Sequence, residues 1–334
     1  MIDLALVWVG IIGLGVFIYV VMDGFDLGIG ILFPFIQGQQ ERDVMMNTVA
    51  PVWDGNETWM VLGGAGLFAA FPLVYSTVLS ALYLPIILMV VALIFRGVAF
   101  EFRFKAHRTQ YLWDQAFIWG SFLSSFFQGV ILGAYIQGIE TQNGIYSGGV
   151  WDWLSPFTIF TGIGVAVMYA TLGCGWLILK TESQLQDAMY QLMPKLLIAL
   201  LTIFAVVSIY TPLTHPEIAQ RWFALPNLLY FSPVPVFVMI FSGLILKACA
   251  QRKDIQPFVY TLVLVFVAFT GFVISLWPNI IPPSVSIWQA AAPESSMKFT
   301  LVGAVILIPI ILAYTFLSYW VFRDKVRIGD EGYH

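Results

Sequence analysis

Nine long stretches of apolar residues constrain the fold of this chain more than any other feature of its sequence. A helix needs about 20 apolar residues to cross the hydrocarbon core of a bilayer, and each stretch approaches that length. Strands of a β-barrel would instead alternate apolar and polar residues, so the sequence predicts an all-α integral membrane protein. We expect the spans at Leu4–Phe33, Trp59–Tyr75, Val78–Phe95, Phe117–Ile139, Phe157–Leu179, Leu196–Tyr210, Val234–Ala250, Pro257–Trp277 and Phe299–Phe322.

The boundary between the second and third spans is the least defined, because 71–77 leaves room only for a tight turn. Merging the two would give eight spans, but the merged segment of about 35 residues exceeds one crossing. The basic residues favour nine, because all of the 15 except Arg221 and Lys298 follow odd-numbered spans or lie in the C-terminal tail. Basic residues near span ends stay in the cytoplasm. We therefore expect a periplasmic N-terminus and a cytoplasmic C-terminus.

The composition excludes a large soluble enzyme. Hydrophobic residues make up 60% of the chain and charged residues only 10%, against about 45–50% and about 25% in an ordinary soluble domain. The net charge of −4, with basic residues confined to short loops, argues against a nucleic-acid partner. Cys174 and Cys249 lie in apolar stretches without the spacing of metal ligands, so no metal site is expected. The connecting segments are short, which predicts one polytopic membrane domain over 1–334.

Five acidic residues lie in or beside the first three expected spans. Asp23 and Asp26 are three residues apart inside the first apolar stretch, and so share one helix face. Asp54 and Glu57 precede the second span and Glu101 follows the third, so all five are expected to converge on the cytoplasmic side. An ionisable group within a span is costly unless it is paired or hydrated, and is a functional candidate by default. Such carboxylates can relay protons when burial allows both protonation states.

A structural interpretation of three of these acids stays open. Asp54, Glu57 and Glu101 could cap helix starts or form ion pairs at the interface. The basic residues available for such pairs are Arg96, Arg103 and Lys105. The two acids of the first span lie deeper in an apolar run, which favours a functional role for them.

Two glycines accompany the first-span acids. Gly24 and Gly28 form a GxxxG step, which allows a second helix to approach the backbone closely. We therefore expect a tight helix pair at this level of the first span.

The three histidines argue against haem ligation by this chain. His107 lies in a basic loop, His215 in an external loop beside a proline, and His334 at the last position. A membrane-embedded haem usually takes an axial histidine, alone or with methionine. None of the three falls within an expected span, so we expect no cofactor ligated by this chain.

The acidic motifs VMDGFDLG (21–28), APVWDGNETW (50–59) and FRGVAFE (95–101) together resemble subunit II of cytochrome bd-type quinol oxidases. The similarity continues through GGAGLFAAFP (63–72) and, more loosely, into the C-terminal span at 305–315. The short external loops and the length of 334 residues most resemble the cyanide-insensitive branch of that family.

The resemblance implies nine transmembrane helices arranged as two four-helix bundles plus one peripheral helix, in the bacterial inner membrane. It implies a partner, subunit I, that carries the low-spin and high-spin haems, of b and d type, and the quinol-oxidising loop. The complex would oxidise quinol and reduce dioxygen to water with protons from the cytoplasm. The resemblance also allows a small single-helix subunit and a structural quinone, neither of which the sequence identifies.

The resemblance also assigns roles to individual residues. Asp54 matches an aspartate proposed to line a proton pathway toward the haems, and Asp23 and Asp26 match the family's first-helix acids. Glu101 stands where other members can have aspartate, so its carboxylate has a different reach. Trp59 matches a tryptophan near a proposed route for oxygen in some members. We expect the proton pathway to use Asp23, Asp26, Asp54, Glu57 and Glu101.

Two other classes of function stay open. A self-sufficient ion-coupled transporter could also use intramembrane acids and helices interrupted by glycine or proline, although an inverted repeat or a midplane charge would then be expected. A purely structural membrane scaffold would tolerate replacement of every acid by its amide.

Overall fold

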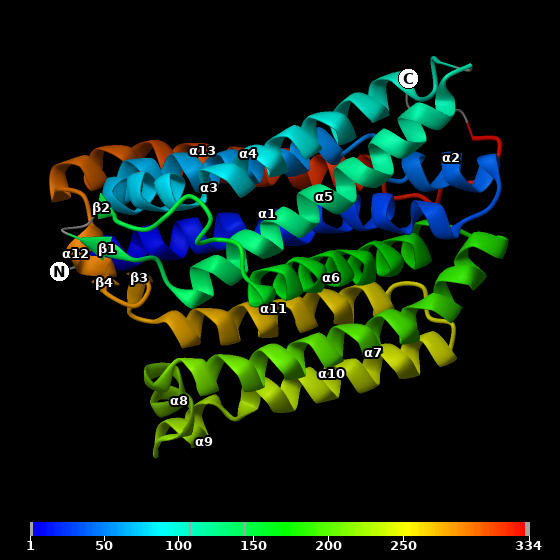
Figure 1. Cartoon of the computed structure of the whole chain (residues 1–334). Coiled ribbons are helices and arrows are strands. Elements are labelled where there is room, and N and C mark those ends of the chain that lie inside the picture. Colours follow the sequence, from blue (N-terminus) through cyan, green and yellow to red (C-terminus); the bar gives the residue numbers. More distant parts are fainter. Residues whose placement is uncertain (1–2, 107, 143–144, 331–334) are drawn as a thin grey trace.

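The computed structural model describes residues 3–106, 108–142 and 145–330, and these are mostly helical (Figure 1). Long helices run back and forth beside one another in this part of the chain. They are α1 (Leu4–Leu32), α3 (Trp53–Ala70), α4 (Pro72–Phe102), α5 (Gln110–Gln137), α6 (Pro156–Lys180), α7 (Ser183–Thr214), α10 (Pro233–Ala250), α11 (Gln256–Leu276) and α13 (Glu294–Val321).

Short elements gather at the two ends of the long helices. The end that holds the start of α1, here called the N-terminal end, also carries α8 (Pro216–Phe223), α9 (Asn227–Phe231), α12 (Ile287–Ala290) and two antiparallel hairpins. The hairpins pair β1 (Thr141–Gln142) with β2 (Ile145–Tyr146), and β3 (Asn279–Ile281) with β4 (Val285–Ser286). The opposite end, here called the C-terminal end, carries η1 (Phe33–Phe35), α2 (Gln39–Asn47) and the tail after α13.

Eight of the helices in the described ranges are long and apolar enough to cross a membrane, which confirms a multi-pass helical fold. The helix α3 is not among them. Its 18 residues include two acids and four glycines, which lower its mean hydropathy. It nevertheless packs against α1, α4 and α13, so it belongs to the same helical body.

The break between α3 and α4 lies at the first residue of the expected turn. Phe71 leaves the helical conformation (φ −138°, ψ 62°), and Pro72 begins α4 directly. Proline suits the first turn of a helix, where its missing N–H has no intrahelical partner. α4 then continues to Phe102, past a kink at Leu82 that precedes Pro85 by three residues, where the ring removes a backbone hydrogen bond. The expected span at 78–95 was therefore too short at both ends.

The expected tight helix pair forms between α1 and α6. A methyl group built on Gly28 would lie 1.8 Å from the carbonyl oxygen of Tyr169, and one on Gly173 would lie 2.7 Å from backbone atoms of Gly28. Gly24 faces the ring of Tyr169, at 2.8 Å from a methyl built in the same way. The two backbones are in direct contact, so the GxxxG prediction is confirmed.

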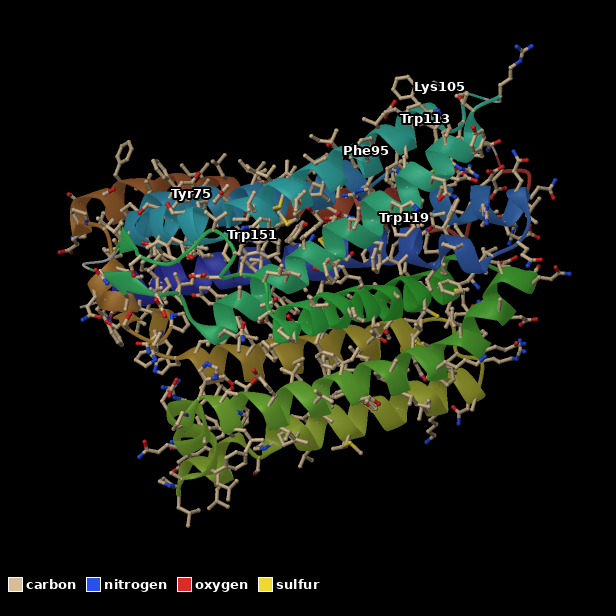
Figure 2. All side chains as sticks on the ribbon, in the orientation of Figure 1. Tyr75, Phe95, Lys105, Trp113, Trp119 and Trp151 are labelled. Atoms are coloured by element: carbon tan, nitrogen blue, oxygen red, sulfur yellow. The ribbon has the colours of Figure 1, made fainter. Side chains whose placement is uncertain are left out.

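The outer surface is strongly apolar. Figure 2 shows side chains projecting from α4 and α5, among them Phe95 and Trp119, which are 57% and 54% exposed. The most apolar part of α13 has no buried residue at all. Exposed apolar surface on this scale does not occur on monomeric water-soluble proteins, so these faces contact lipid or another membrane subunit.

The tail after α13 is held at the end of α6. The ammonium group of Lys180 donates to the carbonyl oxygens of Phe322 and Asp324. The backbone N–H of Val326 in turn donates to the Lys180 carbonyl oxygen at 2.8 Å. A single buried lysine thereby satisfies carbonyl groups at the end of the last long helix.

Two ion pairs extend this attachment. Arg327 contacts Glu182 at 3.1 Å, and Lys325 contacts Asp254 at 2.6 Å. The hydrogen bond from Arg327 lowers the pKa of Glu182. Partial burial raises the pKa of Asp254, but hydrogen bonds from Lys325 and Tyr190 outweigh this effect, so the pKa is lowered overall.

We expect tail docking to be lost only in strong acid. The pKa values of Glu182 and Asp254 are both lower in the folded chain than in an unfolded one. The two ion pairs therefore stabilise docking fully above the ordinary carboxyl pKa of about 4. This stabilisation is lost as the pH falls through the lowered pKa values. A spin label on Ile328→Cys should stay immobilised from about pH 8 to about pH 5 and become mobile below about pH 4. The native cysteines are buried, which favours selective labelling. Release of the label between pH 5 and 8 would contradict the assignment.

Candidate functional site

A cluster of buried ionisable side chains joins α1, α3 and α4. Nη2 of Arg96 donates to Oδ1 of Asp23 at 2.7 Å and to a carboxyl oxygen of Glu57. The side chains of Arg96 and Asp23 are fully buried, whereas that of Glu57 is 25% exposed. The guanidinium also lies over the ring of Trp53, at 5.5 Å from its centroid. One arginine therefore holds two of the predicted acids, and these three residues together with Asp26 are called the acid cluster below.

Asp26 has different partners from Asp23. Nδ2 of Asn56 donates to Oδ2 of Asp26 at 2.7 Å, and the Tyr319 hydroxyl donates to Oδ1 of the same amide at 2.9 Å. The other carboxyl oxygen of Asp26 is buried and has no hydrogen-bond partner in the described part of the chain. The last long helix, α13, thereby contacts the site that begins on α1.

A second hydrogen-bonded group lies further toward the N-terminal end, between α1, α5 and α6. Nε2 of Gln128 donates to the Tyr19 hydroxyl at 2.8 Å, and the Tyr169 hydroxyl donates to Oε1 of Gln128 at 2.6 Å. Tyr19 lies one helical turn before Asp23 on α1. Polar contacts therefore continue beyond the acid cluster into the helix core.

The structure does not bring all five predicted acids together. Glu101 lies on the surface of α4 and pairs with Lys105 at 3.5 Å. Asp54 is exposed in the first turn of α3 and makes no hydrogen bond or ion pair with the residues described. Asp54 and Glu101 therefore lie at the same end of the long helices as the acid cluster, but outside it. Glu101 follows Arg96 by five residues, and this separation places it on a different face of α4 from the cluster.

Trp59 lies buried on α3, only 1% exposed. Its indole N–H is buried without a hydrogen-bond partner in the described residues. The residue predicted beside an oxygen route is thus packed inside this chain.

The motifs did not identify every member of the site. Asn56 lies inside the WDGN string. Gln128 is an uncharged polar residue in an apolar stretch, and this position only weakly indicates a functional role. Nothing near Tyr169 or Tyr319 distinguishes them from the other aromatic residues of the spans. Their hydrogen bonds to Gln128 and Asn56 give them a place in the site.

A second buried arginine lies two turns further along α4. Arg103 contacts Asp43 of α2 at 2.5 Å and Asp114 of α5 at 2.6 Å. Its guanidinium and that of Arg42 each lie 5.3 Å from the ring centroid of Phe33. This layer attaches α2 to the C-terminal end of the bundle, next to the acid cluster.

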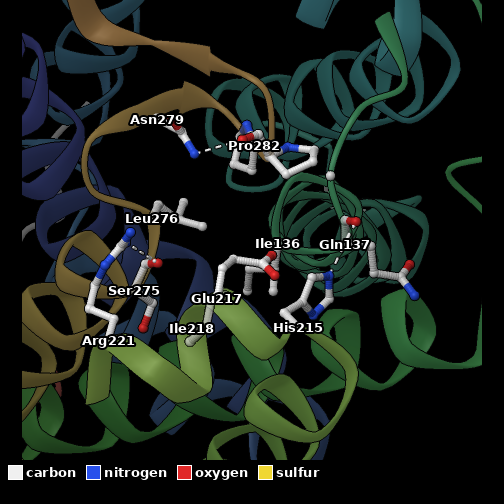
Figure 3. Close-up of a pocket in the computed structure, with 12 residues that line it drawn as sticks. Ile136, Gln137, His215, Glu217, Ile218, Arg221, Ser275, Leu276, Asn279 and Pro282 are labelled. Atoms are coloured by element: carbon white, nitrogen blue, oxygen red, sulfur yellow. Dashed lines mark hydrogen bonds between the residues drawn. The ribbon is translucent and has the colours of Figure 1, made fainter. Parts of the chain in front are cut away.

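A small polar cavity lies at the N-terminal end, between α5, α8 and α11 (Figure 3). Arg221 donates to the Ser275 carbonyl oxygen at 2.8 Å, and Nε2 of His215 lies 3.4 Å from the Gln137 carbonyl oxygen. Burial lowers the pKa of Arg221. The cavity measures about 20 Å³, which is room for about one water molecule. It is too small for an organic substrate.

The described residues show no cluster of metal-ligating side chains. They contain no group of three or more His, Cys, Asp or Glu that could hold a metal ion. His215 follows α7 directly at the N-terminal end, and His107 and His334 lie outside the described residues. The position of His215 does not fit an axial ligand of a haem embedded between the long helices.

A multi-pass helical fold with ionisable side chains buried among its helices defines a polytopic membrane protein. The family model described as cytochrome bd terminal oxidase subunit II matches residues 4–322. The chain therefore belongs to this family. It is a component of a quinol:O2 oxidoreductase complex in the bacterial inner membrane, whose haems lie in a partner, subunit I.

Several characterised proteins are similar over nearly the whole chain. Cytochrome bd-I ubiquinol oxidase subunit 2 of Escherichia coli (strain K12) is 28% identical, over 98% of this chain and 96% of that protein. Cytochrome bd ubiquinol oxidase subunit 2 of Bacillus subtilis (strain 168) is 29% identical, over 97% and 96%. The structure of bd oxidase from Geobacillus thermodenitrificans has a chain with the same fold, with a TM-score of 0.77 at 16% identity over 96% of this chain and 99% of that one. These similarities do not favour the transporter alternative.

Proposed function

We propose that this chain supports the haem-bearing subunit I and contributes to proton delivery from the cytoplasm for the reduction of O2 to water, with quinol as the electron donor. The observation that carries the proposal is the acid cluster, in which Arg96 joins Asp23 to the partly exposed Glu57. Buried carboxyls next to a more exposed one provide the sequence of proton acceptors that such a pathway needs.

In the proposed topology all nine long helices cross the membrane, with α3 included. The N-terminus is periplasmic and the C-terminus cytoplasmic, which the distribution of basic residues supports. The arrangement would be two four-helix bundles with α13 as the peripheral helix. The C-terminal end would then face the cytoplasm and place the acid cluster nearer to it, as proton uptake from that side requires.

Asp54 and Glu57 lie on the same helix, three residues apart, and Asp54 is the more exposed. In the proposed route Asp54 receives protons on the cytoplasmic side and Glu57 passes them inward to Asp23 and Asp26. Glu101 would act at the surface of α4, where subunit I could cover it. Trp59 is proposed to border an oxygen route in the complex.

Replacing Asp54 with Asn should leave the haem spectra of the purified complex largely intact while slowing oxygen consumption. The amide keeps the shape of the side chain but cannot carry a proton. We expect turnover to fall at least about tenfold, equivalent to ~1.4 kcal/mol in the barrier. Oxygen uptake with excess quinol, normalised to haem content, measures the effect.

Glu294→Gln provides a matched control, because Glu294 lies at the opposite end of the molecule in an exposed pair with Lys298. It should turn over like the wild type. Full turnover of Asp54→Asn would remove Asp54 from the pathway, and loss of haem would favour a structural role. If every acid-to-amide variant of the cluster were fully active, the structural-scaffold alternative would be supported.

A further inference from the structure

The two acids of the first helix have partners of opposite chemical character. The partner of Asp23 is the guanidinium of Arg96, which can only donate hydrogen bonds and stays charged at all ordinary pH values. The positive charge of such a partner favours the ionised carboxylate over the neutral acid. The partner of Asp26 is the amide of Asn56, which offers both a donor nitrogen and an acceptor oxygen.

The Asn56 amide can therefore serve both protonation states of Asp26. With the ionised carboxylate, its nitrogen donates to Oδ2, as in the structure. With the neutral acid, a half-turn of the amide presents its oxygen to the carboxyl proton. Tyr319, at 2.9 Å from the amide oxygen, can adjust to either orientation because a hydroxyl both donates and accepts.

The charge balance of the acid cluster also favours a proton on Asp26. Arg96 is the only cation in contact with the three carboxyls among the described residues, and it contacts Asp23 and Glu57. The other titratable groups that face the cluster carry no positive charge: Tyr19 on α1, Asp54 on α3, Tyr169 on α6 and Tyr319 on α13. A fully ionised cluster would thus carry two uncompensated negative charges in a buried setting, which is strongly unfavourable.

The unpartnered oxygen of Asp26 points to the same state. Oδ1 of Asp26 and Oδ2 of Asp23 are both buried without a hydrogen bond from any described residue, but Asp23 has the charge of Arg96 beside it and Asp26 does not. In the ionised form Oδ1 of Asp26 would carry part of a full negative charge without compensation. In the neutral acid, with the Asn56 amide turned so that its oxygen accepts the proton on Oδ2, Oδ1 is a carbonyl oxygen, whose burial costs much less.

We propose that Asp26 is the carboxyl of the acid cluster that holds a proton at pH 7, whereas Asp23 is the resting counter-ion of Arg96. Asn56 and Tyr319 are positioning residues that accommodate Asp26 in both states. This inference depends on the proposed proton-delivery role only where it predicts an effect on turnover. The protonation state of Asp26 is measured separately from turnover.

Infrared spectroscopy of the purified oxidase complex tests the assignment at pH 7. The spectrum of the wild type minus that of Asp26→Asn should contain the C=O stretching band of one protonated carboxyl group, with a downshift in D2O. The matched difference for Asp23→Asn should contain only carboxylate bands. A protonated-carboxyl band in the Asp23 difference, or none in the Asp26 difference, would overturn the proposal.

A conservative variant covers the case in which Asp26→Asn does not assemble. In complex grown with ¹³C-carboxyl aspartate, the wild-type band should shift downward. In labelled Asp26→Glu the band should persist without that shift, because glutamate is unlabelled. Persistence of the shift would assign the proton to another aspartate. These spectra are independent of oxygen consumption, so failure of the proton-delivery role and failure of this assignment are distinguishable.

Discussion

The Arg96→Leu variant is expected to accumulate little assembled, haem-containing oxidase in the membrane. Arg96 is fully buried and is the shared partner of Asp23 and Glu57. Its loss leaves Asp23 ionised and unpaired in the helix core, and removal of one partner from a buried ion pair typically costs about 3–5 kcal/mol. Haem content per milligram of membrane protein, with the complex identified on a native gel, measures the loss.

Two further variants separate charge from packing. Arg252→Leu removes an arginine from an exposed pair with Asp187 and should change assembly little, because such pairs contribute about 0–1 kcal/mol. Adding Asp23→Asn to Arg96→Leu removes the stranded charge, and should restore part of the assembled complex. Normal assembly of the single variant would mean that the ion pair contributes little to the fold.

Replacing Gly28 with alanine is expected to disrupt the contact between α1 and α6. The added methyl group would lie 1.8 Å from the Tyr169 carbonyl oxygen and 2.6 Å from its carbon, and backbone atoms cannot rotate aside as a side chain can. Relief requires separation of the two helices, at a cost of at least about 1–3 kcal/mol. We expect a lower thermal midpoint of the purified complex and a reduced yield.

Gly10→Ala is the matched control on the same helix, because a methyl group there meets nothing within 4 Å. Its midpoint should equal or slightly exceed that of the wild type. A Gly28→Ala complex as stable as this control would show that α1 and α6 can separate at little cost.

The helical membrane fold could be predicted from sequence because the length of an apolar stretch is set directly by bilayer thickness. Helix ends could not be predicted as well. The sixth expected span began at Leu196, whereas α7 begins at Ser183, since a helix can continue through polar residues beyond the apolar layer. Similarly, α4 continues through Pro85 with a local kink at Leu82.

The site was predicted only in part. The spacing of Asp23 and Asp26 predicted that they share one face of α1, and both are buried there. This prediction needed only the geometry of a single helix. Which acids meet depends on the rotation of each helix against its neighbours, and this left Glu101 at the surface. Contacts between distant segments, such as that of Asn56 with Tyr319, 263 residues apart, have no local sequence signal.

That contact between α3 and α13 also has a consequence for how the protein is made. Helices enter the membrane in order during translation, and Tyr319 is made 263 residues after Asn56. Until then Asn56 lacks its outer partner, and the surroundings of Asp26 stay open to lipid headgroups and water. The site is therefore complete only after α13 has packed against α3.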